Sequence, residues 1–458
     1  MPQVVNGAGS VTRAGVFLYP VGHDMTADDL NGFLMAFQSQ QSELRKKMDW
    51  YLGKHPILQE PAKQGNRPDN RIVDNLPYSN VDTFNGYFIG KNPHITLDSE
   101  TGNASLQDWQ NANSFQDRLA EISKQVDIYG RAFAFIYQNE QSETHMTYSD
   151  PETSFMIYDD TVEQNPLAFV RFAYDEQGQI NGRIYFADHS SAIAGGTLTG
   201  NDDQPSLYGL VPAVEFISND ERQGLNDQIF ALADSLDHAL SQKANQVEYF
   251  DNAYLVIKGL QLPEDDQGNP QFTVAGNQLI YAPAAEATNA GVEFVSKPDG
   301  DTMQENLINR MIEQIYNVTG VVNFNDSRIT GNMTGKALER LLQRMSNRAV
   351  FKRTKFTEAL RELYRVVFSA QTIKGVNADD WSNLQFKFYE NLPADYADEA
   401  NTAKALEGIV SKETQLKVLE DIVDDPKAEI QRMQDEQANS IQNAQKAAGA
   451  VTDSKVGD

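Results

Sequence analysis

The sequence contains no cysteine among its 458 residues. Disulfide bonds, thiolate catalysis and cysteine-ligated zinc are therefore excluded, and a reducing or redox-indifferent environment fits this composition. No apolar run approaches the roughly 18 residues that cross a bilayer, and the first residues, MPQVVNGAGSVTRAG, lack the hydrophobic core of a signal peptide. We therefore expect a soluble protein that is made in the cytoplasm.

Positive charge is also scarce. The chain has 38 Lys+Arg against 65 Asp+Glu, which gives a net charge of -27. Affinity for phosphates comes from basic side chains that displace counterions, so tight general binding to nucleic acid is disfavoured. Because 40% of the residues are hydrophobic and 10% are aromatic, the chain can build real cores, and its length suits about three domains. The composition predicts a folded, acidic protein that does not grip DNA.

Catalytic motifs are missing as well. The histidines form no HxxxH pair and no HExxH motif, which disfavours a metal site carried by a helix; they are His23, His55, His94, His145, His189 and His238. No GxSxG sequence marks a serine nucleophile. The segment TGNMTGKA resembles a phosphate-binding loop, but Thr330 stands at its first glycine position and Ala337 replaces the magnesium-binding hydroxyl. We therefore expect no enzyme activity, cofactor or metal.

One acidic cluster leaves an alternative open. Asp159, Asp160 and Glu163 lie within the sequence YDDTVE, and such carboxylates could bind a divalent cation. A metal-dependent hydrolase or nuclease acting through them would lose its activity on chelation. In a chain this acidic, however, such clusters usually mark a solvated turn. We favour the turn.

Helical and strand patterns alternate along the chain. Residues 26–53 and 112–127 carry apolar side chains at helical spacing, whereas the region from about 131 to 218 consists of short segments of alternating polarity, separated by turn clusters such as DEQGQING. Such segments are typical of an antiparallel meander of strands. Together with the helices described next, they predict an α+β fold that is mainly helical.

A long helix is expected after these strands. Ser218 and Glu221 form a capping-box signature, and apolar residues then recur at three- and four-residue spacing. Residues 253–300 carry short strand signals broken by glycine and proline, and Thr302 with Glu305 predicts the start of a second helix. Two helices therefore flank a β-rich insert.

A third long helix is expected from about Thr334 to Ala370, after the polar loop GVVNFNDSRITGNMTG. The strand-like segment LQFKFYENLP precedes an acidic C-terminal region, in which Ser411 and the pair Asp425-Pro426 are expected helix starts. The polar tail, AAGAVTDSKVGD, is predicted to be disordered.

Seven phrases follow one another along nearly the whole chain. They are WYLGKHPI, PDNRIVDNLPYSNVDTFNGYFIGKNP, DIYGRAFAFIYQNE, DPETSFMIYDD with VRFAYDE, ANQVEYFDNAYLVIKG, GNMTGKALERLL and EGIVSKETQLKVLEDIVDDPKAEIQRMQDEQ. In this order they resemble the portal, or head-to-tail connector, proteins of tailed bacteriophages, particularly those of long-tailed phages of Gram-positive hosts. The family has no catalytic signature, so the resemblance is one of architecture.

The resemblance implies a homo-oligomeric ring, usually a dodecamer, at the portal vertex of the capsid in the virion. A terminase motor would drive double-stranded DNA through this ring during packaging, and the genome would leave by the same route at ejection. The implied partners are other copies of the chain, the terminase large subunit, capsid and scaffolding proteins, and neck or head-completion proteins. The DNA would pass without tight binding, and no membrane is implied. A different ring-forming scaffold protein, without a channel of duplex width, remains the alternative.

The resemblance also implies a portal-like division of the chain into an α/β wing, a two-helix stem, a β-rich clip and a helical C-terminal crown. The implied parts are the wing (1–221), the first stem helix (222–252), the clip (253–300), the second stem helix (301–318), a tunnel loop (319–334), a long helix and strand that return to the wing (335–392), the crown (393–447) and a disordered tail (448–458).

The tunnel loop carries the residues that we expect to face DNA. Asparagine side chains make weak, exchangeable contacts with phosphates, and one arginine in each subunit adds limited attraction. The residues with these properties are Asn323, Asn325, Arg328 and Asn332. The alternative is that this loop is only a flexible connector.

Five basic residues recur at intervals of four on the third long helix: Lys336, Arg340, Arg344, Arg348 and Lys352. Each step of four turns the helix by about 400°, so this basic stripe winds around the helix and flanks its apolar face. Three environments fit this stripe: acidic side chains of the same or a neighbouring subunit, DNA, or solvent alone. We favour an electrostatic seam between subunits, which high salt would weaken, because all but three of the 65 acidic residues lie outside 328–365.

Overall fold

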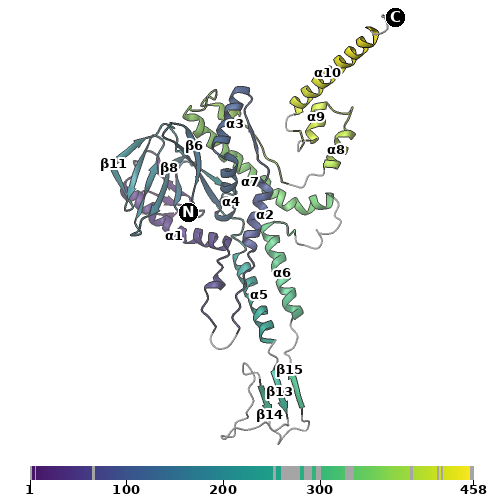
Figure 1. The fold of residues 1–458 in the computed structure, drawn as a ribbon. Coiled ribbons are helices and arrows are strands. Elements are labelled where there is room, and N and C mark those ends of the chain that lie inside the picture. Colours follow the sequence, from purple (N-terminus) through teal and green to yellow (C-terminus); the bar gives the residue numbers. More distant parts are fainter. Residues whose placement is uncertain are drawn as a thin grey trace. The chain divides into compact units, whose positions relative to one another are not determined.

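Two β-sheets organise the N-terminal part of the chain (Figure 1). In the computed structural model the larger sheet has the strand order β1-β2-β3-β7-β8-β9-β10-β11, and neighbouring strands are antiparallel except for β3 and β7, which are parallel. The predicted meander is confirmed for β7 to β11, and strands before residue 20 extend the same sheet. The strands are β1 (Gln3–Val4), β2 (Ser10–Val11), β3 (Phe17–Tyr19), β7 (Ser154–Asp159), β8 (Pro166–Tyr174), β9 (Ile180–Tyr185), β10 (His189–Ala194) and β11 (Thr197–Pro205).

The structure describes all residues except 1–2, 6, 64–67, 251–253, 259–278, 283–290, 296–300, 325–334, 392–395, 420–421, 424–425 and 454–458. The chain divides into two units, Met1–Asn391 and Leu392–Asp458. No helix in the described ranges is long and apolar enough to cross a membrane.

The second sheet separates from the meander. It has the order β12-β5-β6, formed by β12 (Ala213–Ile217), β5 (Arg131–Gln138) and β6 (Thr144–Ser149). Phe133 of β5 packs on Phe169 of β8, with ring centroids 5.4 Å apart, so the two sheets share an aromatic core. A short pair, β4 (His94–Thr96) with β16 (Gln385–Lys387), completes the strands of this part.

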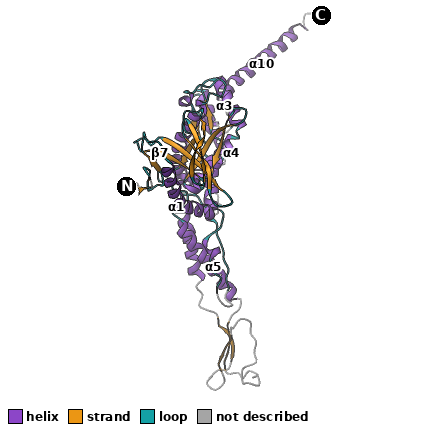
Figure 2. Cartoon of the chain, turned by 90° about the vertical axis from the view of Figure 1, so that its left-hand side faces the viewer, coloured by secondary structure: helices purple, strands orange, loops and turns teal. Residues whose placement is uncertain are grey.

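Helices cover these sheets (Figure 2). Helix α1 begins at a capping box in which Thr26 and Asp29 exchange hydrogen bonds. Helix α7 packs on β12 and on α2, because Phe356 lies 5.2 Å from both Phe88 and Phe216, measured between ring centroids. The helices are α1 (Ala27–Tyr51), η1 (Pro56–Gln59), α2 (Leu76–Ile89), α3 (Glu100–Ala112), α4 (Phe115–Tyr129), α7 (Gly335–Ser369) and η3 (Asp380–Asn383).

Two further helices, α5 (Phe230–Phe250) and α6 (Asp301–Thr319), run side by side away from the sheets (Figure 1). Their buried faces meet in one cluster with residues from α1 and α2; its members include Trp50, Leu76, Ala233, Leu236, Ile308, Met311 and Ile315. Between the two helices the chain forms a sheet of order β14-β13-β15, from β13 (Tyr254–Lys258), β14 (Leu279–Ala282) and β15 (Gly291–Val295). The predicted arrangement of two helices around a β-rich insert is confirmed.

The first of these helices begins later than the capping signature at Ser218 predicts. Residues before Phe230 make bonds to other elements instead of helical ones: the Leu225 N–H donates to Asp127 O (2.7 Å), and Asn226 Nδ2 donates to Pro77 O (2.8 Å). The segment after β12 is therefore a connection fastened to α4 and α2. Long-range hydrogen bonds have overridden the local helical pattern.

The C-terminal unit contains α8 (Tyr396–Ala405), α9 (Lys412–Leu416), η4 (Lys417–Leu419) and α10 (Pro426–Asp453). The expected helix starts are confirmed, because Ser411 accepts a hydrogen bond from the Thr414 N–H (3.3 Å) and α10 begins at Pro426. Helix α10 continues six residues into 448–458, which the sequence predicts to be disordered. Alanine is the best helix former, and the alanines near the end of the chain extend the helix.

Candidate functional site

The loop after α6 is anchored at its start. Gly320 has a φ of +70°, and its N–H donates to Tyr316 O (2.9 Å), which ends the helix in the way that glycine favours. Val321 and Val322 follow and are buried. The chain therefore leaves α6 along a fixed path before it reaches the polar part of the loop.

Only one of the four residues predicted to face DNA lies in the described part of this loop. Asn323 follows the buried valines and is half-buried. The other three, Asn325, Arg328 and Asn332, lie outside the described residues. The expectation for this loop remains a prediction.

The start of the basic stripe lies on the first turns of α7. Lys336 belongs to the helix, and its side chain is outside the described residues. Arg340 is exposed, and so is Arg344, whose Nη1 donates weakly to Asn317 Oδ1 of α6 (3.4 Å). These positions are accessible to a partner.

Arg348 acts within its own chain. Its Nη1 donates to the backbone oxygen of Thr319 (2.7 Å), the last residue of α6. The carbonyls at a helix C-terminus lack partners within the helix and carry partial negative charge, so a guanidinium stabilises this end. Arg348 thereby joins the two helices on either side of the predicted tunnel loop.

Lys352, the last member of the stripe, is buried, with 1% of its surface exposed. Its Nζ donates to Asp127 Oδ2 (2.7 Å), Ser123 Oγ (2.8 Å) and Ser123 O (3.2 Å), all on α4. Three aromatic rings surround the ammonium at 4.7 to 5.3 Å, and they belong to Phe84, Phe88 and Phe356. Lys352 therefore meets an acid of its own chain and is removed from any surface between subunits.

Burial disfavours the charged forms of Lys352 and Asp127, and their mutual attraction opposes this effect. Burial lowers the pKa of Lys352 and raises the pKa of Asp127, whereas the attraction between the two charges opposes both shifts. Hydrogen bonds and the aromatic faces supply further stabilisation of the ammonium. The stripe thus combines surface, helix-end and core positions, as its winding around the helix requires.

The acidic cluster is used by a turn between β7 and β8. Asp159 Oδ1 accepts from the N–H groups of Thr161 and Asn165 (both 3.1 Å), and Asp159 Oδ2 accepts from Asn165 Nδ2 (3.1 Å). Asp160 Oδ1 accepts from the Val21 N–H (3.1 Å). Among the described residues, no group of three or more His, Cys, Asp or Glu side chains could hold a metal ion. These contacts support the turn interpretation.

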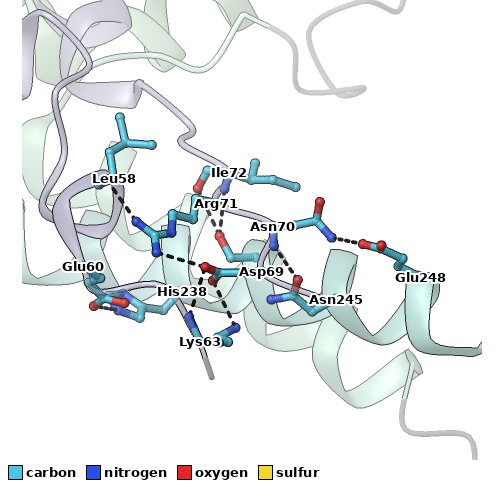
Figure 3. Close-up of polar contacts among 11 residues, drawn as sticks. Leu58, Glu60, Lys63, Asp69, Asn70, Arg71, Ile72, His238, Asn245 and Glu248 are labelled. Atoms are coloured by element: carbon cyan, nitrogen blue, oxygen red, sulfur yellow. Dashed lines mark hydrogen bonds and ion pairs between the residues drawn. The ribbon is translucent and has the colours of Figure 1, made fainter. Parts of the chain in front are cut away.

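A segment that the sequence did not single out lies along α5 (Figure 3). We call the described residues 60–63 and 68–74, between η1 and α2 in the sequence, the strap. Its backbone N–H groups at every second residue donate to helix side chains at every fourth residue. The pairs are Asn70 to Asn245 Oδ1 (2.6 Å), Ile72 to Ser241 Oγ (2.8 Å) and Asp74 to Asp237 Oδ1 (2.9 Å).

This ladder works because two repeats nearly coincide. Two residues of extended chain advance about 6.6 Å, and four residues of helix advance about 6.0 Å. Figure 3 also shows Asp69 between Lys63 and Arg71, with Arg71 Nη2 at 2.9 Å. The polar face of α5 is consequently covered by the strap over its middle turns.

His238 adds a side-chain contact between α5 and the strap. His238 of α5 directs Nδ1 to Asp234 O (2.8 Å) and Nε2 to Glu60 Oε1 of the strap (2.9 Å). The hydrogen bond to Asp234 O, followed by the bond to Glu60, raises the pKa of His238. The sequence offers no signal for these contacts, because the partners are 178 residues apart.

The family model that matches this chain is described as "Phage portal protein, SPP1 Gp6-like", and it matches residues 34–443. A solved structure that the chain is similar to carries the description "Neck of empty GTA particle computed with C6 symmetry"; the two chains are 9% identical, the alignment covers 83% of this chain and 93% of the other, and the TM-score is 0.46. No curated protein sequence matches the chain. The family match spans residues of both units of the fold.

Proposed function

Because the chain belongs to the phage portal protein family of the SPP1 Gp6-like type, we propose that its copies close into a ring that conducts double-stranded DNA during packaging and ejection. Membership makes it a structural protein of the portal vertex in the virion. The ring, its subunit number and the passage of DNA through it are the proposal.

The packed pair of helices α5 and α6 is the observation that best supports ring formation. The two helices pack on each other and on α1 and α2 at one end, and the β13–β15 sheet is inserted between them at the other. Identical subunits that contact each other head to tail must either close into a ring or continue as a filament. A rigid two-helix stem offers each copy two different sides for such contacts.

We assign the remaining parts by the same reasoning. The clip, 253–300, carries β13 to β15 and would dock the terminase motor and later the neck proteins, since edge strands have unpaired backbone groups that another chain can satisfy. Residues 393–447 would form the crown, and capsid and scaffolding proteins would contact the wing, 1–221. These roles extend the family assignment to individual segments.

Passage of DNA fits the charge of the chain. A conduit must release what it guides, and a net charge of -27 avoids a strong grip on phosphates. The tunnel loop, 319–334, would contact the DNA, and Arg348 would support the loop by fixing the end of α6. Arg340 and Arg344 remain accessible for acidic groups of a neighbouring subunit.

Electron microscopy of the purified protein tests the ring. We expect closed rings with a central hole at least as wide as a DNA duplex, twelve subunits being the expected number. Rings with a narrower hole would remove the conduit role, and a strictly monomeric mass at micromolar concentration, also in the presence of the other capsid proteins, would remove the ring.

Two variants test the assigned parts. Arg328→Ala, and separately a shortened loop, should lower DNA packaging or retention in assembled particles while rings stay intact. Deletion of the sequence PEDDQGNPQF from the clip should abolish motor binding. Normal packaging and retention with both loop variants would show that the loop does not conduct DNA, and unchanged motor binding would withdraw the clip assignment.

A further inference from the structure

The strap, α5 and α6 lie side by side in that order (Figure 1). The faces of α5 agree with this view: Asp237, Ser241 and Asn245 meet the strap, whereas Ala233 and Leu236 meet α6. This layer has two unlike edges, one formed by the strap and one by α6. A neighbour on one side therefore meets the strap, and a neighbour on the other side meets α6.

The α6 edge carries three exposed apolar side chains and one cation among polar residues. Met303, Leu307 and Val318 are 75%, 55% and 46% exposed. Met303 faces away from the buried Ile315, whereas Leu307 and Val318 lie on the flank of α6 beside Met311, four residues before it and seven after it. Arg310 lies near them and is exposed, and its guanidinium has no hydrogen bond or ion pair within the described part of the chain.

The strap edge offers matching groups. Ile72 is 39% exposed although its backbone is bonded to α5. Glu60 is also exposed and carries the negative charge of its contact with His238. The strap therefore presents an apolar side chain, Ile72, and a carboxylate, Glu60. The α6 edge presents apolar side chains and the guanidinium of Arg310, which are complementary to them.

The heights of these groups along the stem also match. Lys243 of α5 pairs with Glu305 of α6, and because the helices are antiparallel with the same rise, each step along one corresponds to a step back along the other. Ser241 therefore lies level with residue 307, and His238 lies level with residue 310. Since Ser241 binds the Ile72 N–H and His238 binds Glu60, the strap groups stand at the heights of Leu307 and Arg310.

We propose that in the ring the α6 edge of each copy docks on the strap edge of the next, with Leu307 against Ile72 and Arg310 beside Glu60. This inference rests on the proposed ring. Subunits of a closed ring are related by rotation without translation, so groups that meet stand at equal height along the ring axis, and a stem that runs parallel to this axis places Leu307 level with Ile72 and Arg310 level with Glu60. The strap, rather than α5, is then the surface that a neighbouring copy contacts.

The absence of cysteine allows a direct test with Ile72→Cys and Leu307→Cys in one chain. A disulfide requires Cα atoms within about 7 Å, and α5, about 10 Å thick, separates these positions within a copy. Mild oxidation of assembled rings should give a covalent ladder that extends to the complete ring on a denaturing gel. Each single variant should give only the monomer band on the same denaturing gel.

The control pair is Ile72→Cys with Val318→Cys. Val318 is exposed on the same edge of α6, but it stands about 16 Å further along the helix than Leu307, so this pair should give no ladder. Rings without a ladder for the first pair, or an equal ladder for both pairs, would overturn the docking while leaving the ring in place. Dimers from Leu307→Cys alone would indicate contact between two α6 edges and would overturn it as well.

A charge exchange provides the second test. Arg310→Glu should raise the protein concentration needed for half-maximal ring assembly about three- to tenfold, and Arg310→Glu with Glu60→Lys should bring it back. Failure of the double variant to recover would overturn the pairing of these two residues. If no variant and no wild-type sample forms rings, the proposed function fails together with this inference.

Discussion

His55 Nδ1 lies 2.5 Å from Asp237 Oδ2, and neither side chain is exposed. His55 Nε2 donates to Trp50 O at the end of α1 (3.3 Å), and the other oxygen of Asp237 accepts from the Asp74 N–H (2.9 Å). One carboxylate therefore joins α5 to the residues that precede the strap and to the residue that ends it.

Removal of the Asp237 carboxylate should weaken the contact of α5 with His55 and Asp74. Asp237→Ala leaves the buried ring nitrogen of His55 and the partly buried N–H of Asp74 without partners, so we expect the free energy of unfolding to fall by about 3 kcal/mol. Urea denaturation measures this change, and hydrogen exchange at Asp74 should accelerate. Ser235→Ala, on the exposed face of the same helix, should change stability by less than about 0.5 kcal/mol. Equal effects of the two variants would contradict the role of Asp237.

Lys352→Met should be more damaging alone than together with a change of its partner. The single variant leaves Asp127 charged and buried, which costs about 3 to 5 kcal/mol. Lys352→Met with Asp127→Leu replaces the pair by apolar groups and should recover most of that loss in denaturant unfolding. Lys355→Met removes a more exposed pair with Asp220 and should cost less than about 1 kcal/mol. Additive losses in the double variant would argue against a coupled pair.

Asp29 should make stability depend on acid pH. Burial raises the pKa of Asp29, but hydrogen bonds from Thr26, Ala8 and Tyr19 outweigh it and lower the pKa from 3.8 to about 2. The depressed value means that the carboxylate contributes its full stabilisation above pH 3.8, and that this contribution disappears as the pH falls through about 2.

Asp29→Asn should therefore reduce the free energy of unfolding by about 1 to 2 kcal/mol at pH 7, because the charged acceptor of the bonds from Thr26, Ala8 and Tyr19 is lost. The difference from the wild type should shrink between pH 4 and pH 2, as followed by thermal or urea unfolding. Asp28→Asn, on the same turn and exposed, serves as the control. A difference that stays constant over this range would refute the assignment.

Gly130→Ala should destabilise the junction between α4 and β5. Gly130 has a φ of +89°, and a Cβ there would lie 1.9 Å from Arg222 O. Gly178 has a similar φ of +75° with open space around it, so Gly178→Ala should cost only the backbone strain of about 1 kcal/mol. We expect Gly130→Ala to lower the melting temperature clearly more than Gly178→Ala, and equal shifts would disprove the clash.

The elements that sequence patterns predicted well are those with local signals. Helix α7 begins and ends within a residue or two of its predicted limits, because its apolar face repeats without a break up to Ala370. Ser411 and Pro426 marked their helices for the same reason. Local hydrogen bonding decides these positions.

The strap contact could not be predicted in this way. Asp237, Ser241 and Asn245 look like the solvated face of an amphipathic helix, and their partners are 163 to 175 residues away in the sequence. The burial of Lys352 has a different cause. Spacing of four placed it in the basic stripe, but the winding of that stripe carries its last member into the core beside Asp127.

The row of three hydrogen bonds between the strap and α5 depends on two repeat lengths that are similar but not equal. Two residues of the strap and four residues of α5 differ in length by about 0.6 Å. Over three hydrogen bonds this difference stays small enough for each N–H to reach its acceptor. A few more repeats would move the N–H groups away from the helix side chains. The length over which an extended chain can follow α5 is thereby limited by geometry. Lengthening the strap would therefore add slack rather than further backbone bonds of this kind beyond the pair of Asn70 and Asn245.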